Sequence, residues 1–173
     1  MPIARLNHAV IFVRDAAAAA DFYHEVLGFR TVGSMPNAVF LQAEGSNNDH
    51  DLGLFAIGQG AGPSLAGRQT VGLYHLAWEV ETLDDLERFA ARLAERRALV
   101  GASDHGTTKA LYGRDPDGNE FEVCWLVPAD RITDEMIAAK STIEPLDIAA
   151  EKARFGGSLR GGVGVSSPAA TVV

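Results

Sequence analysis

The chain contains 173 residues with a formal net charge of −8 and a pI near 5.0, and 47% of its residues are apolar. This length and composition predict a globular protein of one domain or two small fused modules, and the lack of clustered Lys and Arg argues against a nucleic-acid surface. The single cysteine, Cys124, fits a reducing compartment, and the lack of a signal-peptide core or a bilayer-length apolar run predicts a cytoplasmic protein without membrane association.

The first half of the chain predicts a strand, a helix and three more strands. Residues 6–13 are rich in β-branched and aromatic side chains, which favours a strand. Asp15 is typical of a helix N-cap and Gly28 of the residue after a helix, so we expect a helix between them. Further strands are predicted at residues 29–32, 38–43 and 51–57. The glycine-rich segment 58–72 is expected to be a linker.

The second half repeats this order. Residues 73–80 predict a strand, and residues 82–93 predict an amphipathic helix capped by Thr82. A short strand at 98–100 and a hairpin follow, and the hairpin turns at Asp-Pro-Asp-Gly-Asn, residues 115–119. Alternation along the return strand predicts one face of Glu120, Glu122 and Cys124 and an opposite face of Phe121, Val123 and Trp125.

A C-terminal extension follows the repeat. Thr133 predicts the start of a helix over residues 134–140, and residues 145–154 predict a second one. The glycine-rich segment 156–164 is expected to be flexible.

Two histidines and one carboxylate stand out in the repeat. His8 and His75 lie at matching places in the first strand of each half, 67 positions apart. Glu122 lies among apolar neighbours, where a carboxylate is costly without a cation. Two imidazoles and one carboxylate leave three positions open on an octahedral ion, which favours non-haem Fe(II), although Mn(II) accepts the same set. The offset of 67 places the counterpart of Glu122 within a few positions of Phe55, and no acid lies between Leu52 and Gly62. The first half is therefore expected to supply no fourth ligand.

The repeat and its local motifs resemble the vicinal oxygen chelate superfamily. The motifs that carry this resemblance are Phe22-Tyr23, Leu27-Gly28-Phe29 and the turn at residues 115–119. The resemblance implies an α+β fold of two βαβββ modules, at about residues 4–58 and 72–126, which form a cupped mixed sheet with the helices outside. It also implies a vicinal oxygen chelate domain over residues 1–128, followed by a helical and irregular extension over 129–173.

A longer motif resembles the type I extradiol ring-cleavage dioxygenases. It consists of His105, five residues, Leu111-Tyr112, two residues, Asp115-Pro116-Asp117-Gly118, three residues and Glu122. The resemblance implies a non-haem Fe(II) enzyme that inserts both atoms of O2 into a catechol-type substrate and opens the ring next to the diol. The implied metal ligands are His8, His75 and Glu122. The implied catalytic residues are His50 as the acid–base histidine, and His105 and Tyr112 as the groups that hold a substrate hydroxyl.

Two other functions share this scaffold. A metal-dependent glyoxalase-like lyase or isomerase would need a fourth protein ligand from the first half, and an antibiotic-binding protein of the bleomycin-resistance kind would need no metal ligands. The sequence predicts pocket walls built from residues such as Phe12, Phe40 and Leu54, and it leaves the ring substituent open. A homo-oligomer is compatible with the sequence. We expect the extension to cross the mouth of the metal site or to contact a neighbouring subunit.

Overall fold

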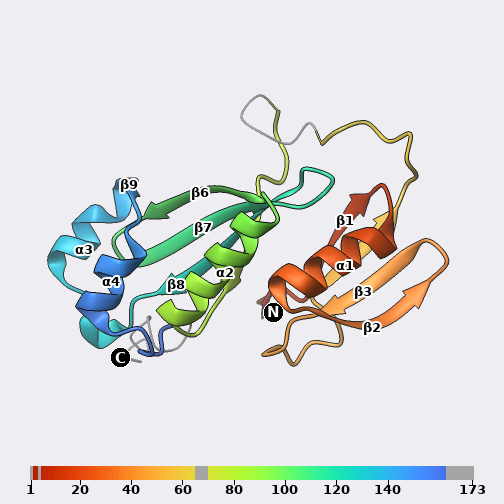
Figure 1. Cartoon of the computed structure of the whole chain (residues 1–173). Helices are drawn as coiled ribbons and strands as arrows, with labels where there is room; N and C mark the ends of the chain where they lie inside the picture. Colours follow the sequence, from red (N-terminus) through yellow and green to blue (C-terminus); the bar gives the residue numbers. More distant parts are fainter. Residues whose placement is uncertain (1, 4, 65–69, 163–173) are drawn as a thin grey trace. The chain divides into compact units, whose positions relative to one another are not determined.

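The computed structural model describes residues 2–3, 5–64 and 70–162 of the chain (Figure 1). Its elements form two compact units. Unit 1 comprises Met1–Thr70 with Asp115–Asn119, and unit 2 comprises Val71–Arg114 with Glu120–Val173. Part of the predicted linker, residues 65–69, and the end of the predicted flexible tail, residues 163–164, lie outside the described residues.

Unit 1 contains the first module, in the order strand, helix and three strands. Its elements are β1 (Ala9–Val13), α1 (Ala16–Leu27), β2 (Arg30–Met35), β3 (Ala38–Gln42) and β4 (Leu52–Ala56). The sheet order is β1-β4-β3-β2, with β1 parallel to β4 and the other pairs antiparallel. The α1 side chains that face the sheet and the leucines of β3 and β4 form the core, because alternate strand residues point to opposite faces.

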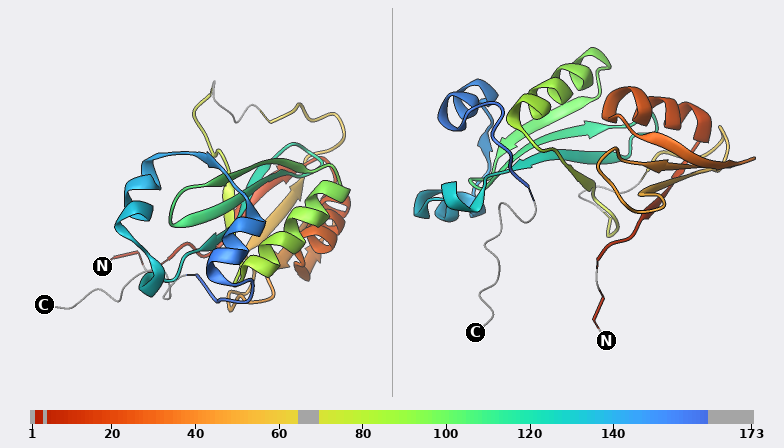
Figure 2. Two further views of the ribbon diagram at one scale, coloured as in Figure 1. Left: turned by 60° about the vertical axis from the view of Figure 1, so that its left-hand side comes forward. Right: turned by 90° about the horizontal axis from the view of Figure 1, so that it is seen from below.

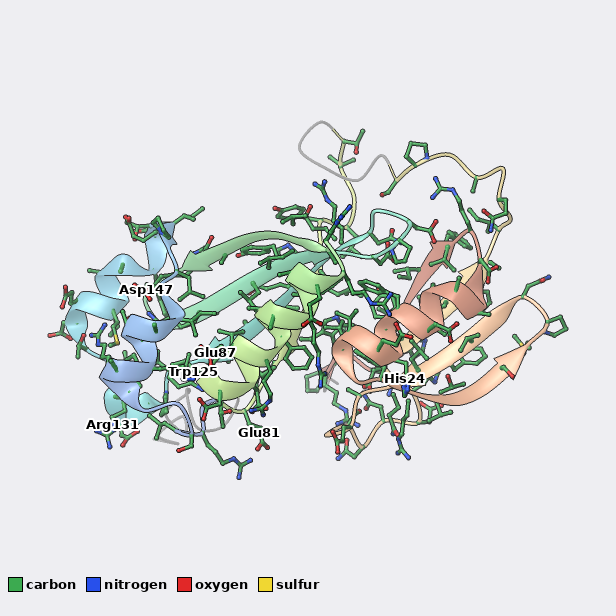
Figure 3. All side chains as sticks on the ribbon, in the orientation of Figure 1. His24, Glu81, Glu87, Trp125, Arg131 and Asp147 are labelled. Carbon is green, nitrogen blue, oxygen red and sulfur yellow. The ribbon has the colours of Figure 1, made fainter. Side chains whose placement is uncertain are left out.

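Local chemistry explains where α1 begins and ends. The Asp15 carboxylate accepts hydrogen bonds from the backbone N–H groups of Ala17 and Ala18, as expected for an N-cap. Gly28 ends the helix with a φ of 73°, a conformation that favours glycine. His24 is exposed near the end of α1 (labelled in Figure 3), and its Nδ1 lies 2.9 Å from the carbonyl oxygen of Phe29.

Unit 2 contains the second module and the described part of the extension. The module consists of β5 (Leu76–Glu79), α2 (Leu83–Glu95), β6 (Leu99–Asp104), β7 (Thr108–Arg114) and β8 (Glu120–Leu126). The extension adds two 3-10 turns, η1 (Ala129–Arg131) and η2 (Ala139–Ser141), with α3 (Asp134–Ala138), β9 (Glu144–Pro145) and α4 (Ile148–Phe155). The sheet order is β5-β8-β7-β6-β9. The α+β fold of two βαβββ modules with mixed sheets is thus confirmed.

The extension packs onto the sheet of unit 2 in two places. β9 pairs with β6 at the edge of the sheet, and α4 lies beside α2 on one face of it (Figure 2). Trp125 is fully buried, and its ring lies 5.5 Å from the Phe155 ring of α4 between centroids. Its Nε1 donates to the carbonyl oxygen of Glu81 (Trp125 and Glu81 are labelled in Figure 3). The extension therefore completes the core of this unit.

Several expected element boundaries differ from the structure, and three of them concern the site histidines and the last helix. β1 and β5 begin one residue after His8 and His75, so each histidine immediately precedes its strand instead of lying within it. The last helix was expected over residues 145–154 but begins at Ile148, after the N-cap Asp147. Pro145 instead pairs with β6 as part of β9, where its missing N–H is tolerated at the edge of a sheet.

The turn at Asp115–Asn119 belongs to unit 1 and is held by one buried carboxylate. Asp115 accepts hydrogen bonds from the backbone N–H groups of Asp117 and Asn119, from the Asn119 amide and from the Tyr23 hydroxyl. Burial raises the pKa of Asp115, and the pKa of Tyr23 is also raised, mainly by burial and then by the charge of Asp115. Gly118 adopts a φ of 87°, as the predicted turn requires.

Asp115→Ala is expected to lower the free energy of unfolding by about 1–3 kcal/mol, because the substitution removes a shared acceptor from buried donors. Chemical denaturation followed by circular dichroism would measure this change. Pro116→Ala is the matched control, because Pro116 is exposed in the same turn. Equal stability of the two variants would contradict this role of Asp115.

Candidate functional site

Unit 2 places four of the predicted site residues on one face of its sheet. Glu122 lies in the middle of β8, and its register partners are Ala77 on β5 and Tyr112 on β7. The alternate residues Phe121 and Val123 are buried on the face covered by helices. The side chains of Glu122 and Tyr112 therefore share the opposite, open face, as the alternation predicted.

His75 lies beside Glu122 on this face. Its Nε2 is 3.0 Å from Oε2 of Glu122, and both side chains are largely buried, at 23% and 12% exposure. A separation near 3 Å is that of an ion pair, and it is also the distance between two adjacent ligands that each lie about 2.1 Å from an octahedral ion. The Nδ1 atom of His75 is buried without a hydrogen-bond partner among the described residues. The pair therefore fits two neighbouring ligands of one cation.

His105 and Tyr112 continue the group. The Tyr112 hydroxyl lies 3.0 Å from Nε2 of His105, and the rings of Tyr112 and His75 are 5.7 Å apart between centroids. His105 Nδ1 lies 3.3 Å from the carbonyl oxygen of Thr142. Because a carbonyl can only accept, Nδ1 carries the proton and Nε2 accepts the hydrogen bond from the Tyr112 hydroxyl. Glu122, His75, Tyr112 and His105 thus form one contiguous set.

The electrostatics of this face keep Tyr112 neutral. Burial, followed by the negative charge of Glu122, raises the pKa of Tyr112 to about 12. The phenol therefore keeps its proton near neutral pH and can donate it in a hydrogen bond. Cys124 is also buried on β8, and burial raises its pKa to about 12, so its thiol is protonated, as expected for a packing residue and not a metal ligand.

We predict that Glu122→Gln lowers the pKa of Tyr112 in the metal-free protein, because the substitution removes a negative charge that opposes ionisation of the phenol. Spectrophotometric titration would measure the shift, with Tyr112→Phe used to assign the transition. An unchanged pKa of Tyr112 in Glu122→Gln would show that the two groups do not interact.

Unit 1 brings together the other two predicted residues, His8 and His50, whose ring centroids are 4.4 Å apart. His8 Nδ1 lies 2.8 Å from the side-chain oxygen of Asn7, and His50 Nδ1 lies 3.1 Å from the carboxylate of Asp49. Hydrogen bonds at Nδ1 leave Nε2 as the free nitrogen of each ring, a pattern common in metal-binding and acid–base histidines. Neither partner was predicted from the sequence, although Asn7 and Asp49 each immediately precede their histidine.

The open face of unit 1 carries an aromatic wall. Phe12 is 65% exposed, and Phe40 contacts the rings of Phe55 and His50 at centroid distances of 5.9 and 5.2 Å. The prediction that Leu54 lines the pocket wall is wrong, because this residue is fully buried on the α1 side of the sheet. The wall on this face consists of Phe12, Phe40 and Phe55, which alternate with the core residues of their strands.

The two sheets also show which residue corresponds to Glu122. In unit 2, Glu122 pairs across parallel strands with the residue two positions after His75. In unit 1, the residue two positions after His8 pairs in the same way with Gly53. The counterpart of Glu122 is therefore Gly53, which lies two positions before Phe55 and within the range expected from the offset, because the loops between strands differ in length in the two modules.

Gly53 leaves the corresponding place in unit 1 without a side chain. A Cβ atom at this position would lie 3.3 Å from Cγ2 of Val10 and 3.4 Å from the ring of Phe55, which is tighter than ordinary packing. β4 itself, Leu52–Ala56, contains no carboxylate. The second module therefore offers a carboxylate at this place, Glu122, and the first module offers none.

Residues 2–3, 5–64 and 70–162 contain no group of three or more His, Cys, Asp or Glu side chains arranged to hold a metal ion. His8 belongs to unit 1, whereas His75 and Glu122 belong to unit 2. The three-residue ligand set therefore stays a prediction, and the pair in unit 2 is the part of it that fits a metal. Over the same residues, no helix has the length and apolar composition needed to cross a membrane.

The fold and this site define a two-module α+β protein with a histidine–carboxylate pair on an open sheet face. Residues 5–123 match the profile of the Glyoxalase/Bleomycin resistance protein/Dioxygenase superfamily, and the chain belongs to this superfamily. This is the vicinal oxygen chelate superfamily that the motifs indicated.

Two curated relatives are named as dioxygenases. The chain is 30% identical over 118 residues to a catechol-2,3-dioxygenase of Bacillus subtilis (strain 168), an alignment that covers 68% of this chain and 40% of the relative. It is 35% identical over 123 residues to biphenyl-2,3-diol 1,2-dioxygenase 3 of Rhodococcus globerulus, covering 69% of this chain and 62% of the relative. This chain therefore spans about two fifths to three fifths of the length of these relatives.

Solved structures with the same fold have diverse names. A glyoxylase/bleomycin resistance protein/dioxygenase domain from Frankia sp. EAN1pec has a TM-score of 0.58 at 23% identity, over 71% of this chain and 92% of that structure. A lactoylglutathione lyase from Agrobacterium tumefaciens has a TM-score of 0.54 at 21% identity, over 72% and 95%. At these identities the likeness concerns the fold alone.

Proposed function

We propose that this protein is an extradiol dioxygenase with a non-haem Fe(II) ion, which inserts both atoms of O2 into a catechol-type substrate and opens the ring next to the diol. The observation that carries the proposal is the contiguous group of His75, Glu122, Tyr112 and His105 on one sheet face. The names of the two dioxygenase relatives support the same reaction class.

The proposed metal ligands are His8, His75 and Glu122, which supply two neutral imidazoles and one carboxylate. Fe(II) bound by this set would offer open positions for a catechol and for O2. A relative from Geobacillus genomosp. 3, 25% identical over 70% of this chain and 36% of its own length, is named a manganese-dependent 2,3-dihydroxybiphenyl 1,2-dioxygenase, so Mn(II) is the metal to compare.

Tyr112 and His105 bind and orient the substrate diol in this proposal. The Tyr112 hydroxyl donates a hydrogen bond to Nε2 of His105, so the phenol oxygen can accept a hydrogen bond from a substrate hydroxyl. His105 is in turn held at Nδ1 by the carbonyl of Thr142. Tyr112 and His105 therefore each donate a hydrogen bond away from the substrate and accept one from the substrate side.

His50 is the proposed proton carrier. Its side chain is 17% exposed, and the Asp49 carboxylate beside Nδ1 orients the ring and leaves Nε2 to exchange a proton. Its contact with Phe40 places it on the aromatic wall of unit 1, which would contact the substrate ring and exclude water. Gly53 counts against the lyase alternative, because it offers no fourth ligand from the place that matches Glu122.

The test is ring cleavage under controlled metal loading. Protein loaded anaerobically with Fe(II), or in parallel with Mn(II), is mixed with catechol, 2,3-dihydroxybiphenyl, protocatechuate or L-DOPA and then exposed to air. We expect uptake of O2 and a yellow ring-opened product with at least one substrate, and neither with Glu122→Ala. Bound metal without O2 uptake for all four substrates would overturn the proposal and favour the lyase or the binding protein.

A further inference from the structure

The Tyr112 hydroxyl and His105 form two consecutive hydrogen bonds, and the C-terminal extension supplies the last acceptor. The carbonyl oxygen of Thr142 lies 3.3 Å from Nδ1 of His105, and Thr142 lies between η2 and β9. A carbonyl oxygen has no proton to donate, so this contact selects the tautomer with the proton on Nδ1. In that tautomer Nε2 can only accept, which fixes the direction of the hydrogen bond with Tyr112.

A buried ion cluster ties a second part of the extension to the same loop. Lys109, at 1% exposure, lies 2.6 Å from the carboxylate of Asp104 and 2.9 Å from that of Glu151 on α4. Asp104 immediately precedes His105 and also accepts a hydrogen bond from the Gly106 N–H at 2.7 Å. A buried lysine needs such partners, because an unpaired charge is costly in a protein interior. The Lys109 ammonium thus links Glu151 of α4 to Asp104, and Asp104 in turn holds the backbone of Gly106.

A close backbone approach adds a third contact. Gly106 has a φ of 73°, and any Cβ at this position would collide with the carbonyl oxygen of Met136 in α3. β9 also pairs with the end of β6, where Asp104 is the register partner of Glu144. The loop from Asp104 to Lys109 is therefore held by α3, by the segment around β9 and by α4, which all belong to the extension.

From these contacts we infer that the extension positions His105: it fixes the ring as a hydrogen-bond acceptor for Tyr112, so that Tyr112 can accept from the substrate. The catalytic consequence rests on the proposed function. Glu151 and Lys109 are positioning residues, because they touch neither the substrate face nor the metal ligands and act through Asp104 and the loop. Without this anchor, His105 is free to place its proton on Nε2, and the bond with Tyr112 would reverse.

The direct test reads the tautomer of His105 in the full-length, metal-free protein. Long-range 1H–15N correlation spectra of 15N-histidine-labelled protein distinguish the Nδ1–H tautomer from the Nε2–H tautomer, and His105→Gln assigns the signal. We expect the Nδ1–H tautomer in the unaltered protein. In Glu151→Gln we expect a mixture of tautomers and, in the metal-loaded enzyme, a fall in kcat of about 10- to 100-fold with a smaller change in KM.

Lys152 provides a matched control on the same helix. Its Nζ lies 2.8 Å from Asp84 and 2.6 Å from Glu87, so it ties α4 to α2 without contacting the His105 loop (Glu87 is labelled in Figure 3). Lys152→Met should leave the His105 tautomer and kcat unchanged. The double variant Lys109→Met/Glu151→Leu removes the cation together with its partner on α4 and leaves Asp104 with the hydrogen bond from the Gly106 N–H. It should show the same tautomer mixture as Glu151→Gln.

The outcomes separate positioning from function. A predominant Nε2–H tautomer in the unaltered protein, or an unchanged tautomer in folded Glu151→Gln, would overturn the positioning role. If the tautomers behave as expected but no catechol is cleaved, the positioning role stands and the proposed dioxygenase activity fails. If the variants do not fold, the His105 tautomer of the unaltered protein decides alone: the Nδ1–H tautomer supports the positioning role, and the Nε2–H tautomer overturns it.

Discussion

Glu122→Ala is expected to abolish metal binding and ring cleavage together. Glu122 is the proposed carboxylate ligand and lies 3.0 Å from His75, so its removal leaves at most two imidazoles for the metal. The loss in metal affinity should exceed the about 10- to 100-fold cost of changing a residue that only supports a ligand. Metal analysis after gel filtration and an O2-uptake assay would measure both effects.

The matched control for this prediction is Glu120→Gln. Glu120 lies on the same strand and face as Glu122, but it pairs with Arg114 at 3.0 Å. This variant should retain the metal and the activity. Full metal content in Glu122→Ala would remove Glu122 from the ligand set.

His50→Phe is expected to slow turnover by about 10²- to 10⁴-fold while metal content stays unchanged, the loss typical when a general acid–base group is removed. Phenylalanine retains the ring that packs against Phe40 and His8, so the wall of unit 1 should persist. His8→Ala should instead lose the metal. Parallel measurement of kcat and metal content in both variants separates the two roles.

Two outcomes would contradict the roles of His50 as proton carrier and His8 as metal ligand. Loss of metal in His50→Phe would make His50 a ligand, and full metal retention in His8→Ala would remove His8 from the ligand set. Either outcome would revise the roles in unit 1 and leave the His75–Glu122 pair untouched, because that pair lies in unit 2.

Features that depend on neighbouring residues were predictable from the sequence. The caps at Asp15, Thr82 and Thr133 were expected from their residue types, and each accepts the hydrogen bond of a helix start. The two faces of β8 followed from alternation, which correctly put Glu122 opposite the buried Phe121. Cap chemistry and alternation act over a few residues, so tertiary packing did not override them.

Features that depend on distant residues were not predictable. The carbonyl of Thr142 contacts His105 across 37 positions of the chain, and a backbone carbonyl carries no residue-type signal. Pro145 resembled a helix start, but its pairing with β6 depends on a strand far away in the sequence. The constant offset placed the counterpart of Glu122 only to within a few positions, because it ignores unequal loops, and the strand register identified this residue as Gly53.

Gly53 has a consequence for how the duplicated halves can diverge. Its surroundings are filled by Val10 and Phe55, so an acidic side chain introduced there would meet two apolar neighbours at close range. A Cβ atom 3.3 Å from Cγ2 of Val10 requires that side chain to shift by a few tenths of an ångström, so an acid at position 53 would be accommodated only with such a shift. The close packing beside Gly53 therefore disfavours an acid there and keeps the two halves chemically different.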